Sequence, residues 1–356
     1  MNKGSLEKYI GHMNLSITDA MSMIDKNTKG LLFIVNGNEQ LVGCVTDGNI
    51  RRWLLKTGNL KASVEDAMNS NPVYLTADDL DKARTTMMAK HITSVPIISE
   101  EHKIIDIVFL SEDNPNVEPV VKDTLKDVPI VIMAGGKGTR LYPYTKILPK
   151  PLIPIKETPI VERILDSFAR YGVEKFYMTV NYKKGMIKSY FADLNPDYEI
   201  CYVEESKPLG TGGSIKLIED KLTRPIIVAN CDSLIVADYS DIYKHHVESG
   251  NEITIVASLK NVTIPYGVLH TASDGHIESM EEKPKLSYLI NTGMYIVNPE
   301  LIELIPDDTM FHMPNLVEMV MARDMKVGIY PVSEDSFLDM GEFSEMKRME
   351  DKLAEA

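Results

Sequence analysis

The chain has 356 residues, more than one ordinary domain needs, and its length predicts two domains. An apolar content of 44% with 25% charged residues is typical of packed globular proteins and excludes extensive disorder. The formal net charge of -14 argues against nucleic acid and anionic membranes as partners, because both would repel the chain at long range.

No stretch of the sequence approaches the roughly 20 consecutive apolar residues that cross a bilayer, so we expect a cytoplasmic protein. The three cysteines are Cys44, Cys201 and Cys231, and no two of them have the spacing of a zinc or redox site. Free cysteines are among the most buried residues, and we expect these three to be inert thiols of the core.

The first 110 residues carry a weak internal repeat. Residues 30–55, GLLFIVNGNEQLVGCVTDGNIRRWLL, predict a strand, a turn at Asn36 and Gly37, a second strand and a helix. The second copy follows the helical segment LDKARTTMMAKH, and residues 94–110 again predict two short strands across a polar turn.

This two-unit pattern resembles a pair of CBS domains, a module that binds adenosyl compounds or other effectors between its halves. In that family a Gly-x-x-Thr-x-x-Asp stretch follows the second strand, with the Thr on phosphate and the Asp on ribose. Here GCVTDGN keeps Gly43 and Thr46 but has Asn49 at the Asp position, and the second copy, DIVFLSE, keeps neither Gly nor Thr. The resemblance implies at most one weak nucleotide effector site, at Thr46 and Asn49, with self-association as a homo-oligomer as the main role.

A change of composition separates this region from the rest of the chain. The stretch from Ser111 to Pro129 holds three prolines among acidic and polar residues and has no sustained period, as expected of a domain seam. We expect the CBS pair in residues 1–120, a linker in 121–127 and a second domain in 128–356.

After the seam, apolar strands alternate with helical segments. The segment PIVERILDSFARYG has the apolar spacing of an amphipathic helix, and KFYMTVNY, EICYVEE, PIIVANCD and NEITIVASL predict strands. This alternation predicts an α/β domain whose mainly parallel sheet is covered on both faces. Ligands of such sheets gather at the carboxyl ends of the strands.

Residues 128–155, VPIVIMAGGKGTRLYPYTKILPKPLIPI, pass from an apolar strand into a glycine-rich loop and a run of cations. Such a loop can direct several backbone N–H groups at one anion, and glycine lets a phosphate approach closely. With Lys137, Arg140 and Lys150 nearby, we expect a polyanionic ligand; a solvated turn is the alternative. The glycine spacing excludes the dinucleotide-binding fingerprint, and the loop lacks the G-K-[ST] ending of a P-loop.

The string AGGKGTRLYPYTKILPKPLIPI is similar to the signature of sugar-1-phosphate nucleotidyltransferases, G-G-x-G-T-R-L followed by P-x-T and P-K-P-L. Those enzymes join a nucleoside triphosphate to a sugar 1-phosphate and release pyrophosphate. Further motifs of the family follow in order: PLGTGGSIKL, ANCDS, EEKP, INTGMY and FLDMGE. The resemblance implies a Rossmann-like nucleotidyltransferase domain with a mainly parallel mixed sheet.

The resemblance also implies a role for each candidate residue. Arg140 and Lys150 would be the catalytic cations, and Asp232 and Asp339 would bind Mg²⁺ as the cofactor. The nucleotide would contact Ala134, Gly135, Gly136, Lys137, Gly138, Thr139, Pro208, Gly210 and Thr211. The sugar phosphate would contact Gly267, Glu282, Lys283, Asn291 and Thr292.

These residue types suit the joining of two phosphates. Mg²⁺ prefers one or two carboxylates plus phosphate oxygens, which fits two aspartates far apart in sequence. The fork of Arg140 can bond two oxygens of the leaving phosphates, and Lys150 supplies a compact charge near the α-phosphate. A general base is not required, because the attacking phosphate oxygen is already ionised.

The fusion of a CBS pair to such a domain resembles the glucosamine-1-phosphate guanylyltransferases of bacterial nonulosonate (legionaminate) pathways. It implies GTP and glucosamine 1-phosphate as substrates. Two alternatives remain within the enzymes: a mannose-1-phosphate guanylyltransferase, and a uridylyl-, thymidylyl- or cytidylyltransferase. From another class, a nucleotide-sensing binding protein with an inactive catalytic domain is the alternative, against which the intact Arg140, Lys150, Asp232 and Asp339 argue.

Overall fold

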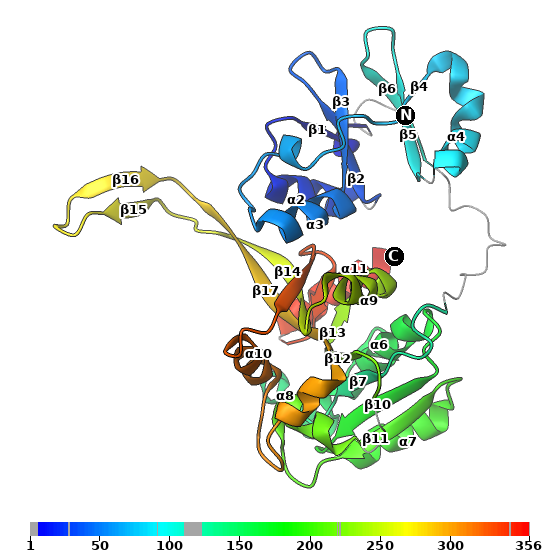
Figure 1. Ribbon diagram of the computed structural model, residues 1–356, viewed down its shortest axis with the longest axis vertical. Helices are drawn as coiled ribbons and strands as arrows, with labels where there is room; N and C mark the ends of the chain where they lie inside the picture. Colours follow the sequence, from blue (N-terminus) through cyan, green and yellow to red (C-terminus); the bar gives the residue numbers. More distant parts are fainter. Residues whose placement is uncertain are drawn as a thin grey trace. The chain divides into compact units, whose positions relative to one another are not determined.

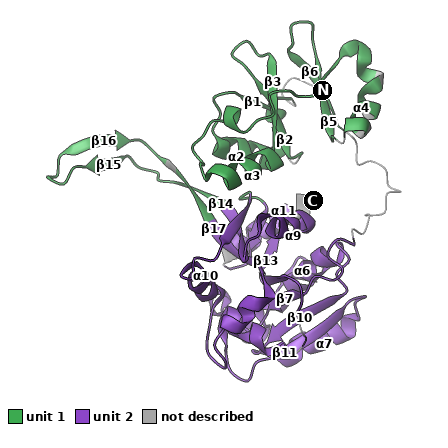
Figure 2. Ribbon diagram, viewed as in Figure 1, with its two compact units in different colours: residues 1–118, 259–289, 333–335 green, residues 119–258, 290–332, 336–356 purple. Residues whose placement is uncertain are grey.

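The structure, a computed structural model, describes residues 6–27, 29–90, 92–109, 123–218, 220, 222–341 and 343–355. The chain divides into two compact units (Figure 2). Unit 1 comprises Met1–Glu118, Leu259–Leu289 and Ser333–Asp335, and unit 2 comprises Pro119–Ser258, Ile290–Val332 and Ser336–Ala356. Since part of the seam lies outside the described residues, the expected bounds of the domains and the linker stay a prediction.

Unit 1 contains the expected repeat as two three-stranded sheets (Figure 1). In each sheet the first strand runs parallel to the second, and the second pairs antiparallel with the third. The strands are β1 (Ile10–His12), β2 (Leu31–Val35) and β3 (Leu41–Thr46), then β4 (Leu75–Thr76), β5 (Ser94–Ile98) and β6 (Ile104–Phe109). The helices are α2 (Ile17–Asn27), α3 (Asp47–Thr57) and α4 (Ala83–Lys90).

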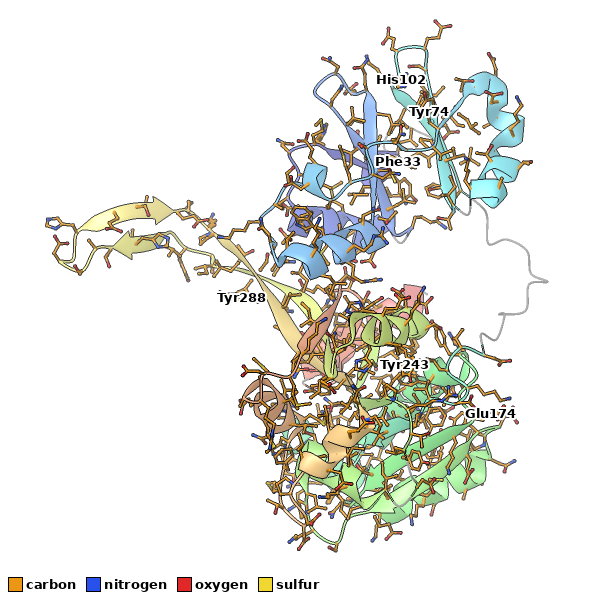
Figure 3. The ribbon with its side chains drawn as sticks, in the orientation of Figure 1. Phe33, Tyr74, His102, Glu174, Tyr243 and Tyr288 are labelled. Atoms are coloured by element: carbon orange, nitrogen blue, oxygen red, sulfur yellow. The ribbon has the colours of Figure 1, made fainter. Side chains whose placement is uncertain are left out.

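The two copies share one core. Leu31 and Phe33 of β2 are buried together with Ile98 of β5 and Ile107 of β6. Figure 3 labels Phe33 within this unit. Each fully buried side chain of this size contributes about 1.5–3 kcal/mol relative to exposure, so this cluster links the halves into one module. The two-copy expectation from sequence is therefore confirmed, apart from His91 and Leu110, which lie outside the described residues.

Unit 2 is built on a seven-stranded sheet in the order β11-β10-β7-β12-β17-β14-β18. Strands β11, β10, β7 and β12 are mutually parallel, β17 is antiparallel to β12, and β18 is parallel to β14. The bounds are β7 (Ile130–Met133), β10 (Lys175–Val180), β11 (Glu199–Glu204), β12 (Ile226–Asn230), β14 (Ile253–Thr263), β17 (Lys285–Val297) and β18 (Val327–Val332). The mainly parallel mixed sheet expected from the alternation of elements is confirmed.

Helices cover both faces of this sheet because successive side chains of a buried strand point to opposite sides. Ile130 and Ile132 of β7 join one core cluster, and Val131 and Met133 join the other. The first cluster includes residues of α6 (Ile160–Ala169), α7 (Lys184–Leu194), α9 (Tyr239–Ser249) and α11 (Phe343–Glu355), and the second includes residues of α10 (Met313–Met321).

Three short antiparallel pairs accompany the larger sheets, one of which joins β8 (Pro154–Ile155) to β9 (Thr158–Pro159) in unit 2. In unit 2, β13 (Ser233–Ile235) pairs with β19 (Phe337–Asp339). In unit 1, β15 (Val268–Thr271) pairs with β16 (Ile277–Glu281). Over the part of the chain that the structure describes, every helix is too short or too polar to traverse a lipid bilayer.

Candidate functional site

Two cavities of unit 2, of about 410 Å³ and 320 Å³, meet at the carboxyl ends of the parallel strands. They share Arg140, Thr211, Asn230, Asp232 and His312 in their linings. The first cavity is also lined by Met133 at the end of β7, Thr179 near the end of β10 and Glu205 just after β11. This is the edge of the sheet where the sequence predicted a ligand.

The glycine-rich loop after β7 forms one wall of the first cavity, through Gly135, Gly136, Gly138 and Thr139. Gly138 has a φ of +64°, and a Cβ there would lie 2.9 Å from Cβ of Lys150. Only glycine allows this close approach of loop and lysine. Ala134 is buried behind the loop, and its N–H donates to the carbonyl oxygen of Thr179 over 3.0 Å.

The predicted nucleotide contacts divide into two groups. Those that line the first cavity are Gly135, Gly136, Gly138, Thr139, Pro208, Gly210 and Thr211. Ala134 and the exposed Lys137 are absent from the described linings of the two cavities. A direct nucleotide contact of these two residues stays a prediction.

The two cations of the sequence motif both reach the cavity lining. Lys150, in a short 3₁₀ turn (Lys150–Leu152), is only 8% exposed, and its Nζ forms an ion pair with the carboxylate of Asp232. Arg140 is exposed in another 3₁₀ turn (Thr139–Leu141) and lines both cavities. An exposed cation, Arg140, and a buried one, Lys150, therefore line the same cavity as Asp232.

The two predicted metal ligands are brought together by the β13–β19 pair, which places Ser233 opposite Asp339. The Ser233 hydroxyl donates to Oδ1 of Asp339 over 3.2 Å and lies 3.4 Å from Oδ1 of Asp232. Burial and the neighbouring charge of Asp232 raise the pKa of the Asp339 carboxyl, against the opposing effects of Lys150, Ser233 and Arg140. Two converging carboxylates of this kind disfavour each other's charge unless a cation joins them.

This donor set fits Mg²⁺. The described residues contain no group of three or more His, Cys, Asp or Glu side chains that could hold a metal ion by themselves. Mg²⁺ is commonly held by one or two carboxylates, with substrate phosphates and water completing its octahedron. Asp232 and Asp339 could provide those two carboxylates.

The second cavity contains part of the predicted sugar site. Asn291 and Thr292 line it, together with Gly293 and Tyr295. The buried Thr292 hydroxyl donates to the carbonyl oxygen of Val256 over 2.7 Å, and Asn291 Nδ2 donates to the Tyr295 hydroxyl over 2.6 Å. These bonds fix the orientation of the cavity wall.

The other sugar-phosphate candidates belong to unit 1. Gly267 and Glu282 are neighbours, since a Cβ on Gly267 would lie 3.0 Å from Oε2 of Glu282. Both residues are exposed, as is Lys283, and the described linings of the two cavities do not include them. Their contact with a sugar phosphate stays a prediction.

Four polar residues that line the first cavity were not singled out from the sequence: Thr179, Glu205, Asn230 and His312. His312 contacts Thr211, whose backbone N–H donates to Nδ1 over 3.3 Å. That contact joins residues 101 positions apart, so no local pattern indicates it. For Thr179, Glu205 and Asn230, the position at a strand's carboxyl end was the available signal.

The candidate effector residues of unit 1 are engaged with each other. Thr46 caps α3, its Oγ1 accepting the backbone N–H of Asn49, while Asn49 Oδ1 accepts the backbone N–H of Thr46 over 3.0 Å. The Thr46 hydroxyl also donates to Asn49 Oδ1 over 2.6 Å. Both side chains thus stabilise the helix start, and effector binding by them stays a prediction.

All three cysteines are free thiols. Cys231 is buried and lines the first cavity beside Asp232, whereas Cys44 and Cys201 are partly buried. Burial raises the pKa of the Cys44 thiol to about 11 and also raises that of Cys231. Raised pKa values leave these two thiols protonated at neutral pH, in agreement with the expectation of inert cysteines.

The fold and site together define a nucleotidyltransferase domain joined to a CBS pair. Residues 130–355 match the nucleotidyl transferase family, and the chain belongs to that family. Residues 12–56 and 64–112 each match the CBS domain. The resemblances stated from the sequence motifs are therefore confirmed at the level of the family.

The chain is similar to sugar-1-phosphate guanylyltransferases and related nucleotidyltransferases. The mannose-1-phosphate guanyltransferase of Saccharomyces cerevisiae is 34% identical over 184 residues, covering 49% of this chain and 51% of the relative. A UTP–glucose-1-phosphate uridylyltransferase of Synechocystis is also 34% identical, over 195 residues, with 49% and 50% covered. The chain spans about half the length of the curated relatives it matches.

Among solved structures, HddC from Yersinia pseudotuberculosis is similar to this chain, with a TM-score of 0.50 and 27% sequence identity. The similarity covers 64% of this chain and 99% of HddC. It therefore includes nearly the whole of HddC and agrees with the extent of the family match.

Proposed function

We propose that this protein is a Mg²⁺-dependent guanylyltransferase that converts GTP and glucosamine 1-phosphate into a GDP-sugar and pyrophosphate. One observation carries the proposal: a single sheet edge combines an anion-binding glycine loop, Lys150, Arg140 and two converging aspartates. Such a site can neutralise charge on a polyphosphate. We further propose that the reaction takes place in the cytoplasm.

The reaction is an in-line substitution at the α-phosphorus of the nucleotide. An oxygen of the sugar phosphate forms the new P–O bond, the bond from the α-phosphorus to the bridging oxygen breaks, and pyrophosphate leaves with that electron pair. In this proposal Lys150 stabilises charge at the α-phosphate, and Arg140 bonds two oxygens of the leaving group. Because charges of this kind are already in place, the site does not have to rearrange them during the reaction.

Mg²⁺ bound by Asp232 and Asp339 would neutralise phosphate oxygens and fix their orientation. The carboxylates themselves hold the geometry: the Ser233 hydroxyl orients Asp339, and the ion pair with Lys150 orients Asp232. Lys150 therefore has two roles in this proposal, as partner of a metal ligand and as a charge facing the nucleotide.

The acceptor is expected in the second cavity, against Asn291 and Thr292. Glucosamine 1-phosphate is proposed because the fused CBS pair resembles that of the nonulosonate-pathway guanylyltransferases. Mannose 1-phosphate is the alternative acceptor, supported by the similarity to the yeast enzyme. Both acceptors are compatible with a wall of fixed amide and hydroxyl groups.

A substrate matrix tests the proposal. The full chain would be assayed for pyrophosphate release with GTP, ATP, UTP, CTP and dTTP against glucosamine, mannose and glucose 1-phosphates. We expect release to require both substrates and Mg²⁺, and GTP with glucosamine 1-phosphate to give the highest kcat/KM. A higher kcat/KM for UTP or dTTP than for GTP would overturn the guanylyl assignment. A higher kcat/KM for mannose 1-phosphate than for glucosamine 1-phosphate would overturn the proposed acceptor.

For the CBS pair we propose a role in homo-oligomer assembly, with at most weak nucleotide binding. The capping box that engages Thr46 and Asn49 supports the weak nucleotide binding, and the assembly role rests on the resemblance to CBS pairs. Adding AMP or ATP to the reaction described above is expected to leave the rate unchanged. A strong response to either nucleotide would identify the pair as a sensor instead.

The close approach of Gly138 to Lys150 gives a prediction about the loop. Gly138→Ala should lower the free energy of unfolding by about 1–2 kcal/mol for the left-handed backbone, and also reduce kcat/KM because the new Cβ displaces Lys150. Gly250→Ala is the matched control, since Gly250 has a φ of +61° with nothing within 4 Å of its Cβ position. Urea titration should show at least as much destabilisation for Gly138→Ala as for Gly250→Ala, because only the new Cβ at position 138 meets a neighbour, and kinetics should show an activity loss only for Gly138→Ala; equal activity would contradict the role of the loop.

A further inference from the structure

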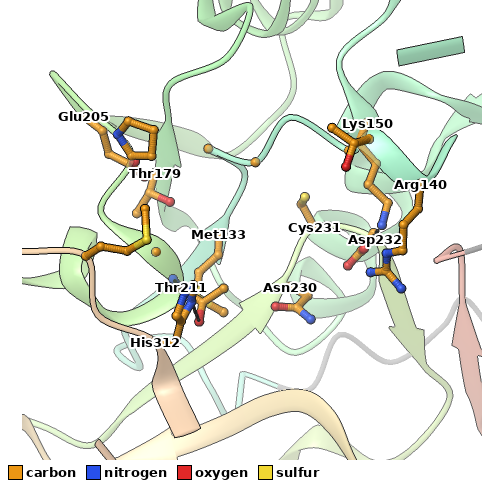
Figure 4. A pocket seen from close by; sticks show the side chains of 17 residues that line it. Met133, Arg140, Lys150, Thr179, Glu205, Thr211, Asn230, Cys231, Asp232 and His312 are labelled. Atoms are coloured by element: carbon orange, nitrogen blue, oxygen red, sulfur yellow. Dashed lines mark hydrogen bonds and ion pairs between the residues drawn. The ribbon is translucent and has the colours of Figure 1, made fainter. Parts of the chain in front are cut away.

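The two proposed catalytic cations lie near the ends of one short segment, residues 138–150. Arg140 follows the glycine-rich loop, and Lys150 begins a 3₁₀ turn after a four-residue helix, α5 (Tyr144–Ile147). Figure 4 shows both side chains on the side of the first cavity where Asp232 lies. Throughout this segment, all of which the structure describes, no helix exceeds four residues. Helices of that length are not stable by themselves, so the position of the segment depends on other elements.

Helix α5 is too short to satisfy its own backbone, because the last four carbonyl oxygens of a helix lack partners within it. The first carbonyl of α5 accepts the N–H that directly follows the helix. The other three accept hydrogen bonds from two side chains just after β10. The Tyr182 hydroxyl donates to the carbonyl oxygen of Thr145 over 3.0 Å. Lys183 Nζ donates to the carbonyl oxygens of Lys146 and Ile147, both over 2.8 Å.

Thr145, the threonine of the P-x-T motif, connects α5 to the glycine-rich loop. Its side chain is buried, and its hydroxyl donates to the carbonyl oxygen of Gly138 over 2.9 Å. A Cβ on Gly138 would lie 3.0 Å from Cγ2 of Thr145 and 2.9 Å from Cβ of Lys150. The threonine, the loop and the catalytic lysine are therefore packed at one point.

Lys183 is a poor residue for the start of α7, where it lies. It is the N-cap of that helix, yet its side chain makes no capping bond there. Its φ of +52° is unfavourable for a residue with a Cβ, and a cation is disfavoured at the positive end of a helix dipole. At the carbonyl end of α5 the same charge is favourable. The contacts of Lys183 thus stabilise α5 rather than its own helix.

We propose that Thr145, Tyr182 and Lys183 are positioning residues that hold the segment between Arg140 and Lys150 in place before substrate binds. The described linings of the two cavities include none of the three, so they act through the cations. Preorganised charges stabilise a transition state best, and a displacement of about 1 Å can lower a rate about 100-fold. This inference rests on the proposed transferase activity and extends it beyond the residues at the cavity.

Thr145→Val tests the hydrogen bond to the loop, because valine keeps the shape of the side chain but lacks the hydroxyl. Kinetics would use the nucleotide and sugar phosphate that the wild type uses best. We expect kcat to fall roughly 10- to 100-fold with a smaller change in KM for the nucleotide. Thr145→Ser keeps the hydroxyl and should retain most of the wild-type kcat. Equal losses in the two variants would overturn the role of the hydrogen bond.

Lys183→Met tests the contact with α5 without touching the core, since the two bonds of this lysine are exposed to solvent. We expect kcat to fall about 10-fold, with little change in the temperature of thermal unfolding. Lys188→Met is the matched control on α7, because the amine of Lys188 pairs with Glu204, and it should keep the wild-type kcat. A wild-type kcat in Lys183→Met would overturn the role of Lys183. Should Thr145→Val not fold, this variant still decides the inference.

Hydrogen–deuterium exchange separates this inference from the proposed function, because it needs no turnover. In the full chain without nucleotide, the amides of residues 138–150 should exchange faster in Thr145→Val and Lys183→Met than in the wild type or Lys188→Met. If the wild type released no pyrophosphate with any substrate pair, the proposed function would fail, and exchange would still show whether these residues hold the segment. Unchanged exchange in both variants would overturn the inference even in an active transferase.

Discussion

Asp232→Asn is expected to lower kcat about 10²- to 10³-fold, the range seen when one preorganised charge-stabilising group is removed from an active site. The substitution removes one of the two carboxylates proposed for Mg²⁺. It also leaves the buried Lys150 without its ionic partner. The two effects act on the same phosphate-binding region, so turnover should suffer more than nucleotide affinity.

Initial rates of the variant would be measured across a range of Mg²⁺ concentrations. The exposed Asp193 on α7 offers a matched control, and Asp193→Asn should behave as wild type. Asp339→Asn should resemble Asp232→Asn, because the β13–β19 pair brings both carboxylates to one point. A near-normal rate of Asp232→Asn at limiting Mg²⁺ would refute the metal assignment.

Lys150→Gln is expected to reduce kcat by a similar factor, about 10²- to 10³-fold, with a smaller change in KM for GTP. The lysine is 8% exposed, and its charge is fixed by Asp232 on one side and by the close packing of Gly138 on the other. A charge held in this way acts mainly on the transition state. Breaking a buried pair also destabilises the fold, by roughly 3–5 kcal/mol in well-buried examples.

Steady-state kinetics and thermal unfolding of the same preparation would separate these two effects. Lys244→Gln is a matched surface control, because Lys244 and its partner Glu248 are both well exposed on α9. If Lys150→Gln raised KM and left kcat unchanged, the lysine would bind substrate and transition state equally, contrary to the proposed role.

The fold of unit 2 could be predicted from local patterns because alternating apolar side chains occupy both cores of a sheet covered on two faces. Ile130 and Val131 illustrate this, as neighbours in sequence that lie in different core clusters. The glycine-rich loop could also be predicted from the sequence, because its backbone conformation and charges are determined within a short segment. The sequence did not predict that residues 259–289 belong to the same compact unit as the CBS pair. That grouping depends on long-range packing, such as that of Leu259 with the core of unit 1.

The site was predicted where a motif marked it and missed where only tertiary contacts define it. Asp232 and Asp339 were named from family resemblance, and the structure adds the antiparallel pairing that brings these distant segments together. Glu205 was read only as a strand end, because its burial beneath Gly135 depends on how two loops pack. His312 was missed because its hydrogen-bond partner, Thr211, is distant in sequence.

Product analysis of a single reaction tests the central claim most directly. The full chain would be incubated with GTP, glucosamine 1-phosphate and Mg²⁺, and the products quantified by liquid chromatography and mass spectrometry. We predict a GDP-sugar and pyrophosphate in a one-to-one ratio, with no product when either the sugar phosphate or Mg²⁺ is omitted. GTP recovered intact with every sugar phosphate, or hydrolysed to GDP and phosphate, would contradict the account and favour a nucleotide-binding protein over a transferase.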